Sequence, residues 1–217
     1  MFDWTGTLVD EYDMDRNVCK NMELEISKKE RITLEEAKRK YLGMLNKYEN
    51  LWEWYNYPLH GKIFGIDWKK AQISELQNLR IIPKAIDVVS YYKERGYYIC
   101  LVTNAAKEVL DLRMDYLKMR SLFDLIVTSD DVKSSKTTGK HFEYAMKLID
   151  TKGKDVYVIG DSLSQDILPA TKFKFITIQC KLGDTAYLHT NNNKTSSLDV
   201  SPDYIITRID ELLEIIK

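Results

Sequence analysis

The stretch VYVIGDSLSQD at residues 156–166 decides the fold class of this chain. It opens with a short apolar run at residues 156–160, which ends in Gly160 and is followed by Asp161 and, five residues later, Asp166. A short apolar run that ends in turn-forming and acidic residues is typical of a buried parallel strand with polar groups at its carboxyl end. We therefore expect a strand that delivers two carboxylates to one edge of a sheet.

Working outward from this run, similar apolar stretches predict four further strands, with helical periodicity between them. The expected strands are residues 97–103, 125–128, 173–179 and 204–207, and the expected helices are residues 84–95, 107–119, 140–149 and 209–216. This alternation predicts an α/β fold with a Rossmann-like core, in which an open parallel sheet carries helices on both faces. The polar segment 183–202 is interpreted as a surface loop.

Residues 11–80 differ in texture, because they are rich in charged and aromatic side chains with helical periodicity. Thr33 and Glu36 have the spacing of a capping box, which predicts a helix start at Thr33. One expected helix face then carries apolar side chains at Leu34, Ala37, Tyr41, Leu45, Tyr48, Trp52 and Tyr55. Two more helices are expected at residues 15–30 and 68–79. We therefore expect a small all-helical domain at residues 11–80, inserted into a core made of residues 1–10 and 81–217.

The composition excludes several classes of protein. Lys and Arg number 32 and Asp and Glu number 33, so the net charge is -1, which argues against a nucleic-acid binder. No apolar run approaches the roughly 18–20 residues that span a bilayer. The three cysteines Cys19, Cys100 and Cys180 lie far apart, which indicates neither a disulfide framework nor a zinc site. We expect a soluble cytoplasmic protein without nucleic-acid or membrane partners.

Polar side chains follow several of the expected strands at the point where each strand ends. They are Asp3, Thr103, Asn104, Lys136, Asp161 and Asp166. Because the carboxyl ends of parallel strands share one edge of a sheet, these groups should gather there. Hard carboxylate oxygens favour Mg²⁺, and a lysine and a hydroxyl group can bind a phosphoryl group. One carboxylate remains free to attack as a nucleophile and to form an acyl phosphate.

The strand-end residues lie in four short motifs, which follow one another along the chain. They are DWTGTLVD at residues 3–10, LVTN at residues 101–104, KTTGKHFEYA at residues 136–145, and GDSLSQD at residues 160–166. Together they resemble the haloacid dehalogenase superfamily of hydrolases with a helical cap. The resemblance implies that residues 11–80 form the cap. It also implies a Mg²⁺-dependent phosphatase that acts on a small phosphorylated metabolite through an aspartyl phosphate.

The resemblance also implies residue roles, each by its position in the motifs. Asp3 would be the nucleophile, Thr5, Thr103 and Lys136 would complete the catalytic set, and Gly6 and Asn104 would bind substrate. The metal would be held by Asp3, Asp161, Asp166 and the backbone carbonyl of Thr5. Lys133 and Lys140 are neighbouring alternatives to Lys136, and the third motif lacks the prolines usual in the family.

The first motif departs from the phosphatase pattern at Thr5. Phosphatases of this superfamily read D-x-D-G-T, and their second aspartate acts as the acid and base. Threonine does not ionise near neutral pH, so this change should slow turnover by roughly 10²–10⁴-fold. Threonine at this position is similar to P-type ATPases, whose phosphoenzyme is long-lived.

Three alternative functions stay open from the sequence. The chain could be a non-catalytic or nearly inactive phosphate-ligand binder, or a haloacid dehalogenase. It could also be a phosphonoacetaldehyde hydrolase-type enzyme with a Schiff-base lysine in the cap, such as Lys47. The aromatic cluster between Trp52 and Trp68 is assigned to the cap core, with a substrate-facing wall or a homodimer surface as the alternatives.

The start of the chain is a second departure. Only two residues precede Asp3, whereas a central strand usually needs about five. We expect a missing stretch of native sequence upstream, and a nucleophile that is less firmly held without it.

Overall fold

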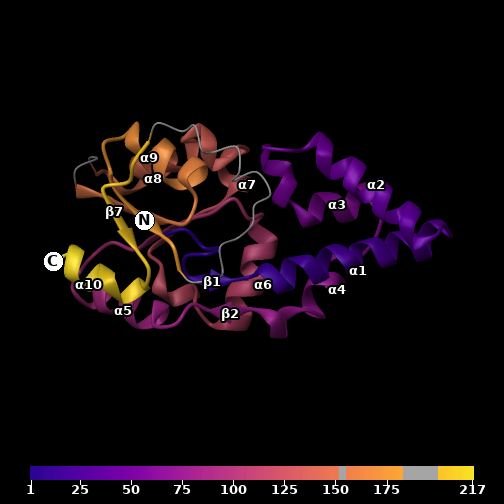
Figure 1. Cartoon of the computed structure of the whole chain (residues 1–217), viewed down its shortest axis with the longest axis horizontal. Coiled ribbons are helices and arrows are strands. Elements are labelled where there is room, and N and C mark those ends of the chain that lie inside the picture. The colour runs from indigo at the N-terminus through magenta and orange to yellow at the C-terminus, as the bar shows by residue number, and fades with distance from the viewer. Residues whose placement is uncertain (152–154, 183–199) are drawn as a thin grey trace.

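The computed structural model describes residues 1–151, 155–182 and 200–217. Figure 1 shows a strand-containing region that holds both termini and a helical region that extends away from it. The strands are β1 (Val9–Asp10), β2 (Arg80–Ile81), β3 (Cys100–Val102), β4 (Leu125–Val127), β5 (Tyr157–Gly160), β6 (Ile176–Cys180) and β7 (Tyr204–Ile206). The helices of the extended region are α1 (Tyr12–Glu30), α2 (Leu34–Lys47), α3 (Tyr57–Phe64) and α4 (Trp68–Ile73).

The remaining helices follow the strands, as the alternating pattern predicts. They are α5 (Ala85–Glu94), α6 (Lys107–Leu117), α7 (Ser129–Val132), α8 (Lys140–Ile149), α9 (Leu168–Thr171) and α10 (Leu212–Ile215). Short 3-10 turns lie at Trp52–Tyr55, Leu76–Asn78, Arg120–Leu122, Lys136–Thr138 and Ile209–Glu211, and a π-helical turn covers Leu163–Ile167. The α/β prediction is confirmed for the described residues.

The parallel sheet is centred on the first three residues of the chain. Strand β3 pairs with β4, and β5 pairs with β6, which pairs with β7, all in parallel register. Phe2 bridges Leu101 on one side and Ile159 on the other, so residues 1–3 lie between β3 and β5. The order is therefore β4, β3, residues 1–3, β5, β6 and β7. β1 and β2 form a separate antiparallel pair where the helical region joins.

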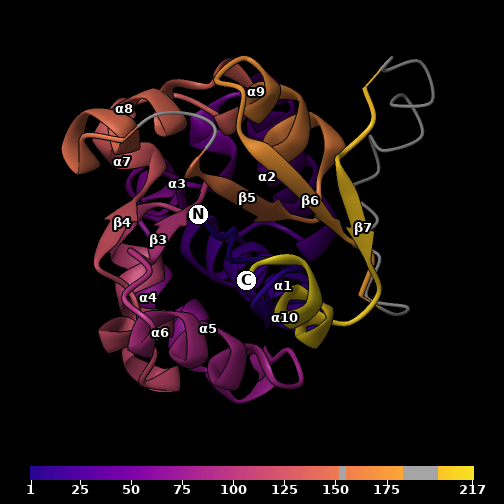
Figure 2. The same cartoon turned by 90° about the vertical axis from the view of Figure 1, so that its left-hand side faces the viewer.

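Alternating side chains divide the core between the two faces of this sheet. Met1, Cys100, Val102 and Val158 pack on one face with residues of α8 and α9. Phe2, Leu101 and Ile159 pack on the other face with residues of α5, α6 and α10. Figure 2 shows α8 and α9 on one side of the strands and α5, α6 and α10 on the other. The predicted two-sided helical cover is confirmed.

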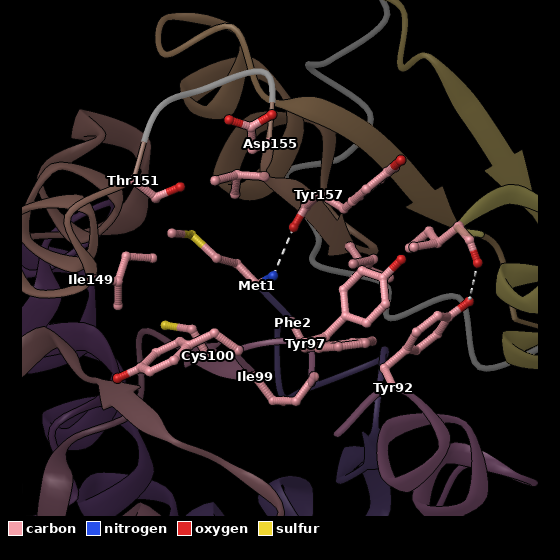
Figure 3. Close-up of a pocket in the computed structure, with 14 residues that line it drawn as sticks. Met1, Phe2, Tyr92, Tyr97, Ile99, Cys100, Ile149, Thr151, Asp155 and Tyr157 are labelled. Atoms are coloured by element: carbon pink, nitrogen blue, oxygen red, sulfur yellow. Dashed lines mark hydrogen bonds between the residues drawn. The ribbon is translucent and has the colours of Figure 1, made fainter. Parts of the chain in front are cut away.

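The central stub forms backbone hydrogen bonds with both neighbours despite its length. Phe2 N donates to Cys100 O (2.8 Å), and Asp3 N donates to Ile159 O (2.9 Å). Met1 donates its amino group to Tyr157 O (2.7 Å), as Figure 3 shows, and burial lowers the pKa of that amino group to about 6. A cavity of about 220 Å³ lies beside Met1. The stub is therefore paired on both sides, Phe2 with β3 and Asp3 with β5, and the expectation of a missing upstream stretch stays a prediction.

Two helical predictions are wrong in detail. The expected apolar stripe continues to Tyr55, but α2 ends at Lys47, and Trp52 and Tyr55 lie in a separate 3-10 turn. Asn50 has a φ of 65°, a left-handed conformation that breaks an α-helix and that asparagine tolerates. Leu34 is exposed, whereas Ala37, Tyr41 and Leu45 are buried. The predicted capping box of Thr33 and Glu36 is confirmed.

Other element bounds are also shorter than expected. The helix predicted for residues 68–79 is divided into α4 and a 3-10 turn, and helix α3 was not predicted. The strand predicted for residues 97–103 is reduced to Cys100–Val102, the residues that pair with Leu125–Val127 of β4. Most of the predicted loop at 183–202 lies outside the described residues.

None of the helices in the described ranges combines the length and apolar character that a bilayer crossing demands.

His60 joins α2 and α3 inside the helical region. It is fully buried, its Nε2 donates to Glu53 O (2.9 Å), and its Nδ1 accepts from the Tyr41 hydroxyl (3.1 Å). The carbonyl can only accept, so Nε2 carries a proton, and because burial favours the neutral ring, Nδ1 is left as an acceptor. Burial lowers the pKa of His60 to about 4.

We predict that the contribution of His60 to the free energy of unfolding falls as pH decreases from about 6.5 to about 4, against the opposite contribution of carboxylates such as Asp3, whose pKa burial raises. The unfolded state takes up a proton on His60 near its ordinary pKa of about 6.5, whereas the folded state does so only near 4, so protonation favours unfolding by up to about 3 kcal/mol. Urea unfolding at a series of pH values measures this. The difference in the free energy of unfolding between the parent and His60→Gln, which cannot titrate, should shift against the parent as pH falls through this range, and parallel curves for the two proteins would contradict the prediction.

Candidate functional site

The predicted strand-end residues come together at one edge of the sheet. Asp3 follows the central stub, Thr103 follows β3, and Asp161 follows β5. All three line one pocket of about 50 Å³, together with Lys136 and Thr5. The pocket is therefore formed at the carboxyl ends of neighbouring parallel strands, as in other open α/β sheets.

A buried lysine lies at the base of this pocket. Lys136 is 2% exposed, and its Nζ forms ion pairs with Asp3 and, at 2.5 Å, with Asp166. Its backbone N–H donates to the Asn104 side-chain oxygen (2.8 Å). Burial of a lysine without partners would be strongly unfavourable, so these two carboxylates hold it in place and raise its pKa.

The two neighbouring lysines lie outside the cluster. Lys133 is exposed and pairs with Asp130 (3.0 Å), and Lys140 is exposed at the start of α8. The structure thus brings Lys136, and not its alternatives, to the pocket. Lys47 is exposed on α2 and does not line the pocket either.

Two glycines allow the acidic loops to approach the central strand closely. Gly6 has a φ of 74°, and a Cβ built there would lie 2.7 Å from Asp161 Oδ2. A Cβ on Gly160 would lie 2.3 Å from the carboxyl carbon of Asp166. The Asp166 carboxylate also accepts from the backbone N–H of Ser162 (3.0 Å), at the start of the π-helical turn. Both aspartates therefore depend on residues without a side chain for their positions.

The donor set fits a divalent metal ion. Ligand oxygens of Asp3, Asp161 and Asp166 lie within 4.8 Å of one another. Three carboxylates and the ammonium group of Lys136 leave a formal charge of minus two, which a divalent cation would neutralise. Oxygen ligands of this kind suit Mg²⁺. The geometry thus admits the metal that the sequence analysis expects.

The electrostatic state of the cluster reflects burial. Burial raises the pKa of Asp3 to about 7, although Lys136 opposes this shift. Burial and the neighbouring carboxylates also hold the pKa of Asp161 well above its ordinary value. A bound cation would lower both values, because it favours the charged form of each carboxylate.

Thr5 is bonded to a glutamate that the sequence analysis did not identify. The Thr5 hydroxyl donates to Glu11 Oε2 (2.7 Å), and Trp4 Nε1 donates to Glu11 Oε1 (2.6 Å). Arg113 on α6 pairs with Glu11 Oε1 (2.9 Å) and with Asp15 on α1 (2.5 Å). Glu11 and Arg113 are both buried and line the pocket, so a second buried ion network borders the site.

The helical region contributes one wall of the pocket. Asp15, Tyr55 and Tyr57 line it from that side. Gln165 donates to the Tyr55 hydroxyl (3.3 Å) and accepts from the Asn104 side chain (2.8 Å). A chain of side-chain hydrogen bonds therefore links the sheet edge to the helical region beside the pocket.

The side chains of Thr103 and Asn104 form different hydrogen bonds at the pocket. The Thr103 hydroxyl accepts from the backbone N–H of Ala105 (3.1 Å) at the strand end. Asn104 uses its side-chain oxygen for Lys136 and its side-chain nitrogen for Gln165. Both residues line the pocket, and the geometry gives Asn104 the task of placing its neighbours.

The sequence analysis did not identify several pocket residues, which are Glu11, Asp15, Ala105, Val109, Arg113 and Gln165. Tyr55 and Tyr57 belong to the aromatic cluster for which a substrate-facing wall was one alternative. Gln165 lies inside the GDSLSQD motif beside Asp166, so its motif position could have signalled it. Arg113 carries no such signal, because an arginine on a helix is usually a solvated surface residue.

The chain is similar to a known family of hydrolases and to individual proteins of known sequence. The model of the haloacid dehalogenase-like hydrolase family matches residues 1–173. Pyrophosphatase PpaX of Bacillus mycoides is 27% identical over 132 residues, which are 60% of this chain and 57% of the relative. PpaX of Bacillus anthracis is 26% identical over the same length and 56% of that relative. The matched stretch thus spans less than two thirds of these relatives.

Solved structures share the fold over nearly the whole chain. A phosphatase from Thermococcus onnurineus has a TM-score of 0.82 at 23% identity, with 99% of this chain and 95% of that one covered. The hydrolase YfnB of Bacillus subtilis, bound to magnesium, has a TM-score of 0.63 at 18% identity, with 99% and 96% covered. A 2-haloacid dehalogenase from Pseudomonas syringae has a TM-score of 0.70 at 16% identity, with 99% and 96% covered. These likenesses concern the fold.

We predict that Gly6→Ala damages the acidic cluster. The left-handed backbone at Gly6 disfavours alanine, and the new methyl group would displace the Asp161 carboxylate, so the free energy of unfolding should fall by about 1–2 kcal/mol. The thermal stabilisation by Mg²⁺ should fall with it. Thermal unfolding with and without Mg²⁺ measures both effects.

Gly43→Ala is the matched control for this prediction. Gly43 lies inside α2, and a Cβ there would meet nothing within 4 Å. Alanine should therefore raise stability by about 0.5–1 kcal/mol and leave the Mg²⁺ effect unchanged. An equal loss of the Mg²⁺ effect in both variants would contradict our assignment of Gly6.

Proposed function

The chain belongs to the haloacid dehalogenase-like hydrolase family, and from the geometry of its pocket we propose that it is a Mg²⁺-dependent phosphatase. The observation that carries the proposal is the buried Asp3 carboxylate, paired with Lys136 and grouped with Asp161 and Asp166. A nucleophile, a cation and two further carboxylates at one strand edge suit transfer of a phosphoryl group.

In the proposed reaction, a carboxylate oxygen of Asp3 attacks phosphorus. A bond forms between that oxygen and phosphorus, and the leaving oxygen departs with the electron pair of the broken bond. Lys136 lies against Asp3 and would offset the negative charge of the phosphoryl oxygens, with the Thr103 hydroxyl at the same pocket wall. Mg²⁺ held by Asp3, Asp161, Asp166 and the Thr5 carbonyl would supply further positive charge at the phosphoryl group.

The proposed substrate is a small phosphorylated metabolite, and a phosphoanhydride or acyl phosphate suits the site best. Thr5 cannot protonate a leaving group, so a leaving group that is stable as an anion needs the least help. The pocket of about 50 Å³ favours a small molecule. The name of the PpaX relatives, pyrophosphatase, agrees with this substrate class.

We further propose that helices α1–α4 act as a cap that closes the pocket and selects the substrate. Tyr55 and Tyr57 reach the pocket from this region, and Gln165 bonds to Tyr55. Closure of such a region excludes water from the reacting groups while the phosphoryl group is transferred.

We predict that labelled acetyl phosphate with Mg²⁺ leaves acid-stable, hydroxylamine-labile label on the protein. Asp3→Asn should abolish the label, because an amide cannot act as the nucleophile. The label should persist for longer than a rapid phosphatase would allow, since Thr5 provides no base for its hydrolysis. Acid quench followed by measurement of bound label and released phosphate tests this.

Two outcomes would reject the phosphatase proposal. Label that survives in Asp3→Asn would show that another residue reacts. A protein that takes up no label and releases no phosphate, but is stabilised thermally by Mg²⁺ with phosphate, would be a phosphate-ligand binder instead.

A further inference from the structure

Glu11 is a buried carboxylate of the pocket wall that the proposed reaction leaves unused. It is 2% exposed, and it has three polar neighbours, Trp4, Thr5 and Arg113. Trp4 Nε1 and the Arg113 guanidinium group meet Oε1 at 2.6 and 2.9 Å, and the Thr5 hydroxyl meets Oε2 at 2.7 Å. A tryptophan N–H and a guanidinium group can only donate, so Oε1 accepts both bonds. The ion pair with Arg113 favours the ionised form of Glu11, in which Oε2 can only accept, so the Thr5 hydroxyl donates to it.

We propose that Glu11 is a positioning residue that turns the Thr5 hydroxyl for hydrolysis of the aspartyl phosphate, an inference that rests on the proposed function. Because the Thr5 hydrogen points to Glu11, the Thr5 oxygen offers only its lone pairs to the rest of its surroundings. Thr5 lines the pocket with Asp3, so these lone pairs can accept a hydrogen bond from a water beside Asp3. Thr5 orients that water and does not take its proton.

The hydrolytic step balances without a base at Thr5. The water oxygen forms a bond to phosphorus, the bond between phosphorus and the Asp3 oxygen breaks, and its electron pair returns to the Asp3 carboxylate. Both water hydrogens end on the phosphate that leaves, one on the attacking oxygen and one on another phosphate oxygen. The slow release of phosphate then follows from orientation of the water without deprotonation.

Arg113 keeps Glu11 in this role. Its guanidinium group also bonds to Asp15 (2.5 Å) and to the Gln72 side-chain oxygen (2.9 and 3.1 Å). These contacts come from α1 and α4 of the helical region, so Arg113 cannot turn away from Glu11 without breaking them. The orientation of Thr5 is therefore linked to the contact between the helical region and α6.

The Glu11→Gln variant tests the orientation with little change of shape. The amide oxygen can keep the bonds from Trp4 and Arg113, which places the amide N–H₂ group against Thr5. Thr5 then accepts a hydrogen bond from this amide, and its own hydrogen turns toward the pocket. Hydrolysis of the aspartyl phosphate should slow by about tenfold, the effect of one lost hydrogen bond, while its formation changes less than threefold.

A double-mutant cycle separates this role from a structural one. The two rates are measured in single turnovers with labelled acetyl phosphate and Mg²⁺, in the parent, Glu11→Gln, Thr5→Val and the double variant. Because Glu11 acts through Thr5, the double variant should hydrolyse the intermediate no more slowly than Thr5→Val. Thr5→Ser, which keeps the hydroxyl group, should hydrolyse it several-fold faster than Thr5→Val.

The outcomes distinguish this inference from the proposed function. If the parent takes up no label and releases no phosphate, the phosphatase proposal fails and this inference fails with it. If it releases phosphate without accumulating label, only this inference is overturned, because no slowly hydrolysed intermediate exists for Thr5 to act on. If label forms but Glu11→Gln slows its loss equally in the parent and in Thr5→Val, Glu11 acts independently of Thr5 and only this inference is overturned. If Glu11→Gln does not fold, Thr5→Val still decides, because loss of label at the parent rate would overturn the role of Thr5.

The same geometry predicts the effect of an aspartate at position 5. Thr5→Asp would place a second carboxylate against Glu11 Oε2, where like charges repel. Thr5→Asp alone should therefore gain less than threefold in the rate of hydrolysis, whereas Thr5→Asp with Glu11→Gln should gain at least tenfold, because the amide can donate to the new carboxylate. An equal gain in both variants would overturn the coupling.

Discussion

Lys136 lies at the point where four separate segments of this chain meet. Its ammonium group is buried between Asp3 of the central strand and Asp166 of the π-helical turn, and its backbone is held by Asn104 after β3. A buried charge is tolerated only when it is paired, so burial of the Lys136 ammonium group requires the carboxylates of Asp3 and Asp166 beside it. The close packing at Gly6 and Gly160 is part of the same requirement, since it lets Asp161 and Asp166 reach the cluster.

A second buried network connects the site to the helical region. Arg113 of α6 bonds to Asp15 of α1 and Gln72 of α4, and it also pairs with Glu11, which accepts the hydrogen of Thr5. Position 5 is thus not an isolated substitution in a familiar motif. It is one end of a hydrogen-bonded chain that reaches the wall of the pocket opposite the sheet. Thr5 and helices α1 and α4 are therefore joined by one buried network of hydrogen bonds and ion pairs.

Local sequence patterns predicted most of the helices and strands, but not the residues at which they end. Thr33 and Glu36 correctly marked the start of α2, because a capping box needs only neighbouring residues. The apolar spacing continues past the end of α2 at Lys47, and it could not reveal the left-handed backbone at Asn50, which prevents one continuous helix from reaching Tyr55. Likewise, the apolar run at residues 97–103 is longer than β3, because a strand extends only as far as its partners allow.

By itself, the sequence determined the α/β class, the parallel order of strand and helix, and the grouping of Asp3, Thr103, Lys136, Asp161 and Asp166 at one edge. These follow from periodicity and from residues that directly follow strands, which are local properties of the chain. Only the tertiary structure decided that Lys136 and not Lys133 enters the cluster, and that Glu11 and Arg113 border it. Glu11 and Arg113 are 102 positions apart, and no local pattern indicates which distant charge a buried residue will find as its partner.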